Sequence, residues 1–390
     1  MEERRGQLLL VPPFYPGSTT ARIPIDQGVI HSSHEIPGSA EPISGVLGKG
    51  RGGRYQMDPV QWSVGLSRLV LSGIMGLAVG DALGVPVEFR ERETLTRDPV
   101  VGMRAYGTYN KPSGTWSDDT SMTLCLMSSL AEGLDYDEIM RNFLKWYKAG
   151  EFTADGHTFD VGTTTSAALE RFGRGVPALE CGGTGEYDNG NGSLMRILPL
   201  VFYLCTVYGV NFQDSSEAFD IIHNVSALTH AHKRSQIACG IYLSIAAMLL
   251  SSSDLEYAVK MGIAKAVEYY EKQPEYAEEL DHFSRLRSED FRKIPREEIS
   301  SSGYVVSSLE AAIWCLLNTN DYASCVLEAV NLGDDTDTVA AIAGGLAGLA
   351  YGYEAIPQDW LNVLLRREYL EDTCHEFSRA LVYRGTDKEF

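Results

Sequence analysis

The chain has 390 residues, of which 44% are apolar, and it carries a formal net charge of −20. This length is sufficient for one large domain or two small ones, each with a substantial core. So acidic a chain does not favour nucleic-acid binding, because neutralising phosphates needs clustered Lys and Arg side chains. A substrate that contains phosphates would then depend on backbone amides, helix N-termini or bound cations.

The distribution of apolar residues and cysteines bears on the compartment. No run of 18 or more apolar residues is present, so we expect no transmembrane helix. The apolar run from Leu8 to Val11 is too short for the core of a signal peptide. The seven cysteines are odd in number and scattered along the chain, as is typical of free thiols in a reducing environment. These features together predict a cytoplasmic protein.

Residues 1–56 differ in composition from the rest of the chain. They contain six of the 15 prolines and nine of the 38 glycines, and they show no helical periodicity. Pro12-Pro13 and Gly52-Gly53 would interrupt any regular element. We therefore predict a flexible or extended arm at 1–56, followed by a single globular domain at 57–390.

From Trp62 onward the apolar residues recur with helical spacing. Leu66, Leu69, Val70 and Ile74 follow the i, i+3, i+4 pattern, and no convincing alternating run predicts a strand. Further helices are expected near residues 120–132, 137–148, 163–173, 193–208, 216–230, 235–251, 255–271, 305–317, 321–331, 337–352 and 358–383. Residues 272–300 are charged and irregular, which indicates a surface excursion. The predicted fold class is all-α.

Two acidic clusters precede two of the predicted helices. The first is the segment from Gly114 to Thr120, GTWSDDT, and the second is the segment from Gly333 to Thr338, GDDTDT. Ser, Thr and Asp are preferred N-caps, so either cluster alone is compatible with simple helix capping. One Asp is enough for a cap, however, and further carboxylates side by side repel one another. A hard cation such as Mg²⁺ or Mn²⁺ would relieve that repulsion, whereas zinc is disfavoured because neither cluster contains His or Cys.

A glycine-rich segment, YDNGNGS, runs from Tyr187 to Ser193 ahead of an apolar stretch. It is compatible with a plain loop whose glycines adopt positive φ. It is equally compatible with a cradle in which the backbone approaches a ligand and the next helix offers free amides.

These motifs resemble the ADP-ribosylglycohydrolases. The matching pieces are GLAVGDALG at 76–84 with Glu88, WSDDT at 116–120, DVGTT at 160–164, NGNGSLMR at 189–196, LTH at 228–230 and GDDTDT at 333–338. They occur in the family's order over about residues 65–355. The resemblance implies an all-α fold with a site for two Mg²⁺ ions, or Mn²⁺ in their place. By position, the implied metal ligands are Ser117, Asp118, Asp119, Asp335, Asp337 and Thr338. Two positions depart from the family, which often has Thr at 117 and Gly at 334.

The resemblance also implies an activity and the residues that serve it. The expected reaction removes ADP-ribose from modified protein side chains, most specifically arginine, with serine linkages and O-acetyl-ADP-ribose left open. The implied substrate-binding residues are Gly162, Thr163, Asn189, Asn191, Gly192, Ser193 and His230. Glu88 is assigned to a loop that gates the metal site. Asp160 is the candidate for the acid/base or ring-opening step, with a helix N-cap as its alternative role.

Two other classes of function remain open at this point. One is a non-catalytic relative that keeps the fold as a binding module, and the other is a different metal-dependent hydrolase acting on ADP-ribose derivatives or nucleotides. The arm adds a further hypothesis, because its apolar and aromatic residues from Leu8 to Pro16 are unusual for a solvated tail. Extended, proline-stiffened segments of this kind dock into grooves of partner proteins. We expect a cognate ADP-ribosyltransferase toxin as its partner, which would make the chain an immunity protein.

Overall fold

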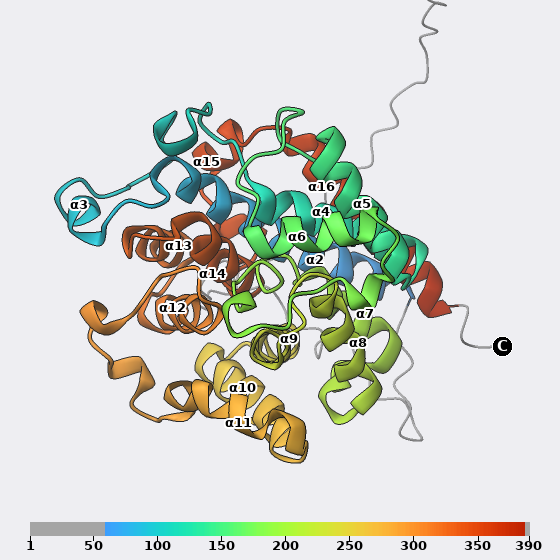
Figure 1. Cartoon of the computed structure of the whole chain (residues 1–390). Helices are drawn as coiled ribbons and strands as arrows, with labels where there is room; N and C mark the ends of the chain where they lie inside the picture. Colours follow the sequence, from blue (N-terminus) through green and yellow to red (C-terminus); the bar gives the residue numbers. More distant parts are fainter. Residues whose placement is uncertain (1–58, 387–390) are drawn as a thin grey trace, which may run out of the picture. The chain divides into compact units, whose positions relative to one another are not determined.

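Every regular element that the structure describes is a helix (Figure 1). The computed structural model describes residues 59–386. Within this range no β-strand is present, and only isolated bridges link loop residues. The predicted all-α fold class is confirmed. The predicted arm at 1–56 lies outside the described residues and stays a prediction.

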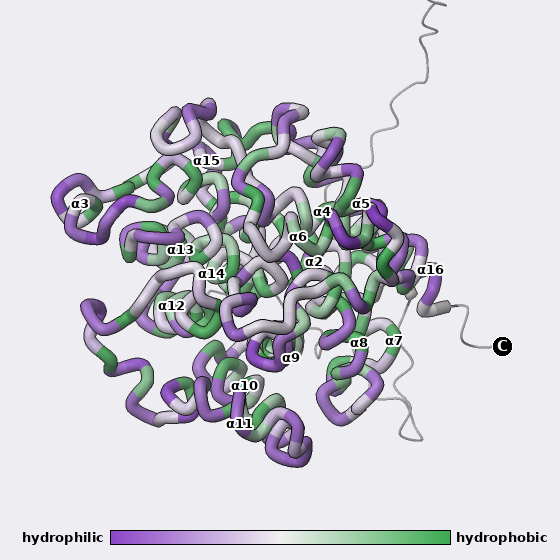
Figure 2. The backbone as a smooth tube through the Cα atoms, viewed as in Figure 1, coloured by the Kyte–Doolittle hydropathy of each residue, from purple (hydrophilic) through white to green (hydrophobic). Residues whose placement is uncertain are grey.

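The longer helices follow the order expected from the sequence. They are α2 (Pro59–Gly84), α4 (Asp118–Glu132), α5 (Tyr136–Ala149), α6 (Thr163–Gly173), α7 (Pro199–Tyr208), α8 (Ser216–Ala227), α9 (Lys233–Ser251), α10 (Leu255–Glu271), α12 (Val305–Asn318), α13 (Tyr322–Asn331), α14 (Thr336–Tyr351) and α16 (Arg367–Thr386). Three short α-helices accompany them, namely α3 (Arg92–Arg97), α11 (Ala277–Leu280) and α15 (Gln358–Val363). Hydrophilic residues gather on outlying elements such as α3 and α11 (Figure 2).

Some predicted boundaries were wrong. The helix expected at 193–208 begins at Pro199, which lacks an N–H and therefore suits the first turn of a helix. The helix expected at 358–383 is two helices, separated at residues 364–366, where Arg366 has a φ of 53°. The segment 272–300, expected to be irregular, contains α11 and several 3₁₀ turns. Helix α3 was not predicted.

The contact between α2 and α14 determines where the site lies. A Cβ atom on Gly80 would collide with the carbonyl oxygen of Ala340, and one on Gly84 would collide with the backbone of Asp337. A Cβ on Gly76 would likewise meet the backbone of Gly344. Only glycine allows backbones to approach so closely. Successive glycines of α2, numbers 76, 80 and 84, thus meet residues 344, 340 and 337 of α14. The two helices are therefore antiparallel, and the end of α2 meets the start of α14.

Two described stretches, Ser63–Val87 and Lys233–Ser251, are long and apolar enough to cross a membrane when judged by length and composition. Their most apolar windows are 94% and 89% buried inside the protein. Packing within the fold therefore accounts for their apolar character.

Candidate active site

The two acidic clusters lie in the first turns of α4 and α14. Ser117 is the N-cap of α4, and its hydroxyl accepts a hydrogen bond from the backbone N–H of Asp119. Asp335 is the N-cap of α14, and Asp337 lies in the first turn of that helix. Carboxylate oxygens of Asp81, Asp119 and Asp337 lie within 4.8 Å of one another. The clusters at 114–120 and 333–338, far apart in sequence, therefore meet beside the end of α2.

Asp337 belongs to a second group of carboxylates as well. Oxygens of Glu88, Asp160 and Asp337 also lie within 4.8 Å of one another. Glu88 and Asp337 are buried, and Asp160 is partly exposed. One shared side chain thus joins two groups of three carboxylates into a single site.

Oxygen atoms in both groups lack partners. Glu88 Oε2, Asp119 Oδ1 and Asp337 Oδ2 are buried and accept no hydrogen bond. A buried anionic oxygen without a partner is strongly destabilising unless a cation or a proton neutralises it. The donor set offers only carboxylate and hydroxyl oxygens, which Mg²⁺ and Mn²⁺ prefer. The residues present therefore fit divalent cations of this class.

The electrostatics of the site agree with this fit. Burial, followed by the nearby carboxylates, raises the pKa values of Asp118, Asp119 and Asp337 well above the usual range. Burial and then the Asp160 carboxylate raise the pKa of Glu88 to about 10, and burial raises the pKa of Asp335 to about 6. No cationic side chain of the described chain is among the main causes of these pKa shifts, so the protein does little to offset the negative charge of these ionised carboxylates.

The remaining predicted metal ligands lie around these groups. The Ser117 hydroxyl donates to Asp119 Oδ2 over 2.9 Å, and the Thr338 backbone N–H donates to Asp337 Oδ1 over 2.9 Å. Asp118 is 6% exposed, and Asp335 accepts a hydrogen bond from Asn191. All six predicted ligands therefore share the two helix starts.

Asp81 is a residue of the site that the sequence analysis left without a role. Its carboxylate accepts hydrogen bonds from the backbone N–H groups of Ser117 and Thr120 and from the Thr120 hydroxyl, the last over 2.6 Å. It is fully buried, and burial raises its pKa to about 7. Asp81 thus fixes the first turn of α4 to α2. Asp81 is the only acidic residue of α2 and the only polar side chain in its stretch 73–84, which was the signal that could have identified it.

Tyr109 is a second residue that the sequence analysis missed. Its hydroxyl donates to Asp160 Oδ1 over 2.6 Å, and Asp160 has a φ of 54°, in the left-handed region that favours glycine and tolerates Asp. The Thr108 hydroxyl donates to the carbonyl oxygen of Glu88 over 2.7 Å. The loop at 107–109 therefore holds both Asp160 and Glu88. Nothing in its irregular sequence predicts this contact.

The predicted substrate-binding residues separate into two sets. Gly162 and Thr163 are exposed at the N-terminus of α6, where free amides are available to a phosphate. Gly192 is partly exposed, and Asn191, which is 8% exposed, donates from Nδ2 to Asp335 Oδ2 over 2.8 Å. Asn191 is therefore bound to a predicted metal ligand.

The second set is buried beneath the glycine-rich loop. Asn189, Ser193 and His230 are each at most 3% exposed. Ser193 Oγ accepts from the Ser226 hydroxyl, and the Thr229 hydroxyl lies 2.8 Å from His230 Nδ1. Burial lowers the pKa of His230 to about 3, so it is a neutral packing partner. These contacts support the loop from inside, and the assignment of the three side chains to ADP-ribose stays a prediction.

Comparison with known proteins identifies the fold and its motifs. The profile of the ADP-ribosylglycohydrolase family matches residues 65–387. The chain belongs to this family. ADP-ribosylarginine hydrolase Tri1 of Serratia proteamaculans is 33% identical to this ADP-ribosylglycohydrolase over 328 residues, which cover 81% of this chain and 80% of the relative. ADP-ribosyl-[dinitrogen reductase] glycohydrolase of Rhodospirillum rubrum is 30% identical, over 75% of this chain and 89% of the relative.

A solved structure, described as an ADP-ribosylglycohydrolase-related protein complex, agrees in fold. Its TM-score is 0.65 at 30% identity, and the match covers 80% of this chain and 98% of that one. The chain is thus an enzyme of the family, a hydrolase that removes ADP-ribose. The departure at Asp334 has a local explanation, since its φ of 63° lies in the left-handed region that favours glycine and also tolerates Asp.

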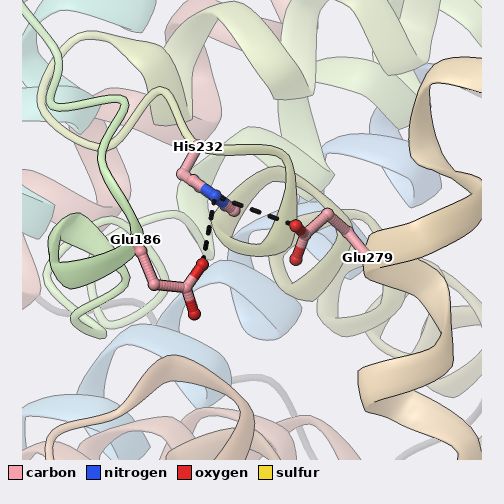
Figure 3. A group of neighbouring side chains, drawn as sticks. All are labelled: Glu186, His232 and Glu279. Carbon is pink, nitrogen blue, oxygen red and sulfur yellow. Dashed lines mark ion pairs between the residues drawn. The ribbon is translucent and has the colours of Figure 1, made fainter.

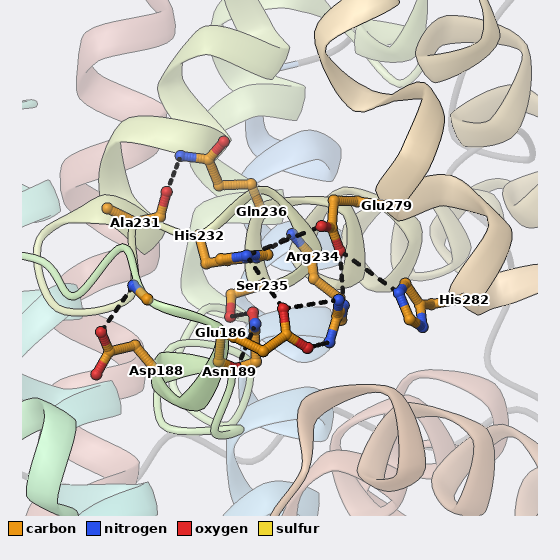
Figure 4. A network of polar contacts seen from close by, with 11 residues as sticks. Glu186, Asp188, Asn189, Ala231, His232, Arg234, Ser235, Gln236, Glu279 and His282 are labelled. Atoms are coloured by element: carbon orange, nitrogen blue, oxygen red, sulfur yellow. Dashed lines mark hydrogen bonds and ion pairs between the residues drawn. The ribbon is translucent and has the colours of Figure 1, made fainter.

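This ADP-ribosylglycohydrolase has a third group of ligand-type side chains, formed by Glu186, His232 and Glu279 (Figure 3). His232 Nε2 lies 3.9 Å from Glu186 Oε2 and 3.8 Å from Glu279 Oε1. Unlike the two acidic groups, this one already contains a cation. Arg234 Nη1 lies 2.8 Å from Glu186 Oε1, and Nε lies 2.7 Å from Glu279 Oε2 (Figure 4). The group is therefore a salt-bridge network rather than a metal site.

The network holds the glycine-rich loop in place. Glu186 lies on the segment that leads into Asn189, and the Ser235 hydroxyl donates to Asn189 Oδ1 over 3.1 Å (Figure 4). The side chain of Arg234 is only 5% exposed, and that of its partner Glu279 is 21% exposed, so this charged hydrogen bond is better shielded from solvent than the one to Glu186, whose side chain is 61% exposed. The start of α9 thus secures one end of the loop, and Asn191 secures the other end to Asp335.

Proposed function

We propose that this chain is a divalent-metal-dependent hydrolase that releases ADP-ribose from modified arginine side chains of proteins. The observation that carries the proposal is the pair of carboxylate groups that share Asp337 and leave buried oxygens without partners. The concentration of carboxylates around Asp337 supports a site for two ions, and the oxygen-only donors favour Mg²⁺ or Mn²⁺. The name of the Serratia relative, ADP-ribosylarginine hydrolase, supports arginine as the modified residue.

The proposed ligand set consists of side chains at the starts of α4 and α14. It comprises Ser117, Asp118, Asp119, Asp335, Asp337 and Thr338. When bound, ions of this kind orient the ribose hydroxyls and lower the pKa of a water molecule. Asp81 would act indirectly, because it holds the first turn of α4 in position. Asn191 would do the same for Asp335.

Asp160 is our proposed acid/base residue. Hydrolysis breaks the bond between the anomeric carbon and the guanidine nitrogen, and forms one between that carbon and the water oxygen. The water loses a proton and the departing guanidine gains one, so a titratable group beside the reacting atoms is needed. Tyr109 supports Asp160 in this role by donating a hydrogen bond to Oδ1, which leaves the other carboxylate oxygen for proton transfer. We propose that Glu88 closes the metal site from the neighbouring loop.

The test is release of free ADP-ribose from an arginine-modified protein, measured after EDTA treatment and again after adding Mg²⁺ or Mn²⁺. We expect EDTA to abolish release and the cation to restore it. Asp119→Asn should stay inactive with added metal, whereas Asp372→Asn, a change in an exposed carboxylate of α16, should match the parent. Release that is unaffected by EDTA would contradict metal dependence. Release from serine-modified protein or O-acetyl-ADP-ribose alone would contradict the arginine assignment.

A second role is proposed for the N-terminal arm. Residues 1–56 precede the segment 65–387 that the family profile matches, so they lie outside the part of the chain that resembles the family. We propose that they bind a cognate ADP-ribosyltransferase and block it. Deleting 1–56 should then preserve ADP-ribose release and abolish binding to the transferase, whereas Asp119→Asn should do the reverse. Equal binding by the truncated and full-length chains would refute this role. The proposed compartment is the cytoplasm, which the seven buried free cysteines support.

A further inference from the structure

Two exposed aromatic residues adopt a backbone conformation that is unfavourable for their type. Phe89 has a φ of 62° and is 64% exposed, and Tyr106 has a φ of 67° and is 60% exposed. A bulky residue with positive φ is an outlier, because its Cβ crowds the backbone. Such strain persists only where the surroundings enforce it, and it concentrates at functional sites.

The surroundings of both residues are the loops that form the Glu88 side of the active site. Phe89 directly follows Glu88, and its N–H donates to the carbonyl oxygen of Asp334 over 2.7 Å. The N–H of Asp334 in turn donates to the carbonyl oxygen of Arg90 over 2.8 Å. These bonds tie the Phe89 backbone to the loop that carries the second acidic cluster.

Tyr106 is fixed in the same assembly. Its N–H donates to the carbonyl oxygen of Lys111 over 2.6 Å, which closes the loop that contains Tyr109. The next residue, Gly107, packs so closely on Pro86 that a Cβ atom would collide with the carbonyl oxygen of Pro86. Thr108 then donates to the carbonyl oxygen of Glu88. Both residues thus lie on loops that are held to each other around Glu88.

Neither ring contributes to the core, because more than half of each residue is exposed. Glycine or asparagine at these positions would keep the loop conformation with less strain. The fold alone therefore does not account for aromatic residues here. Exposed aromatic side chains next to a reaction site are suited to contact with another polypeptide, through apolar packing and through stacking with Arg side chains.

We propose that Phe89 and Tyr106 form an aromatic rim that docks the polypeptide segment surrounding the modified arginine of the protein substrate. The inference rests on the proposed function and adds how the enzyme distinguishes a modified protein from a small ADP-ribosyl compound. The predicted ADP-ribose contacts, Gly162 and Thr163, follow Asp160 and come from α6. The rim belongs instead to the loops around Glu88, and it serves the part of the substrate beyond ADP-ribose.

The test compares two substrates, an arginine-ADP-ribosylated protein and free ADP-ribosyl-arginine. The variants are Phe89→Asn, Tyr106→Asn and the double variant, since Asn removes the ring but accepts positive φ. We expect the double variant to raise KM for the protein at least ten-fold, with less than a two-fold change in kcat/KM for ADP-ribosyl-arginine. Because strain is relieved, its Tm should equal or exceed that of the parent. Tyr257→Ala is the matched control, as Tyr257 is 52% exposed on α10, and it should leave KM and kcat unchanged for both substrates.

Three outcomes would overturn the aromatic rim. Equal losses on both substrates would mean that the rings support Glu88 or hold ADP-ribose itself. An unchanged KM for the protein would mean that the rings do not dock it, and a lowered Tm would mean that the rings are structural. If the parent hydrolyses neither substrate, the proposed function fails first and the rim fails with it.

Discussion

Replacing Asp337 with Asn removes the carboxylate that both acidic groups share while keeping the size of the side chain. Each pair of ionised oxygens in these groups is at most 4.8 Å apart. With an effective dielectric constant of about 20, two unit charges at that separation repel each other by about 3.5 kcal/mol. The metal-free Asp337→Asn variant should therefore be more stable than the metal-free parent by about 3 kcal/mol when the carboxylates are ionised.

The pH dependence of this difference follows from the direction of the pKa shifts. Folding raises the pKa values of Asp81 and Asp335 from 3.8 to about 7 and about 6, and it raises that of Asp337 well above its usual range. A raised carboxyl pKa means that the native state binds more protons than the unfolded chain, so this contribution to stability is complete below about pH 4. It is lost as the pH rises through the native pKa values. The metal-free parent should thus be more stable at pH 5 than at pH 8, and the advantage of the variant should grow over that interval.

The assay is urea unfolding of parent and variant after EDTA treatment, at pH 5 and pH 8, repeated with saturating Mg²⁺. Magnesium at about 100 times its Kd should stabilise the parent by about 2.7 kcal/mol, and the variant by much less. Asp372→Asn, which changes an exposed carboxylate, is the control and should follow the parent at each pH. If metal-free Asp337→Asn is less stable than the parent at pH 8, the carboxylates do not repel one another and the reasoning fails.

Three further changes test other parts of the site. Asp160→Asn should preserve ADP-ribose binding and lower kcat at least 100-fold, because it keeps the shape and loses the ionisable group; lost binding with an unchanged kcat would make Asp160 only a ligand contact. Thr120→Val removes the donor to Asp81 Oδ2 at 2.6 Å and should lower the free energy of unfolding by about 1–3 kcal/mol, as urea titration would show. Gly84→Ala places a Cβ against the backbone of Asp337 and should reduce soluble yield and Mg²⁺ binding. Its control is Gly65→Ala, where a Cβ meets no described atom within 4 Å, and this change should raise the free energy of unfolding by up to about 1 kcal/mol. Similar thermal melts for both variants would argue against the close α2–α14 contact.

The acidic ends of α4 and α14 could be predicted because their signals are local. Ser117 and Asp335 precede apolar helical runs, and each proves to be an N-cap. Their convergence was not local information; the repulsion among their carboxylates favoured a shared cation site, and the family resemblance implied one. The physical cause of the convergence is the glycine series on α2, which brings Asp337 against the end of that helix.

The residues that were missed, and the direction in which the loop side chains point, depend on tertiary contacts. Tyr109 lies on an irregular loop, and its partner Asp160 is distant in sequence. The motif that contains Asn189 and Ser193 predicted either a plain glycine-rich loop or a ligand cradle, and its pattern does not reveal which side chains point inward. Burial decided that question, because both side chains are bonded within the protein.

The same arrangement explains why the site needs many carboxylates. Helix N-termini carry partial positive charge, which stabilises the carboxylates of Asp119 and Asp337 but opposes a cation. Several formal negative charges must therefore converge before a divalent ion is held, and one helix start cannot supply them. The antiparallel contact of α2 with α14 supplies the geometry, Asp81 ties α4 into it, and Asp337 is common to both groups. Repulsion among the buried carboxylates thus destabilises the metal-free state of the fold. Binding of a cation would relieve this repulsion, and the relief would contribute to the free energy of binding.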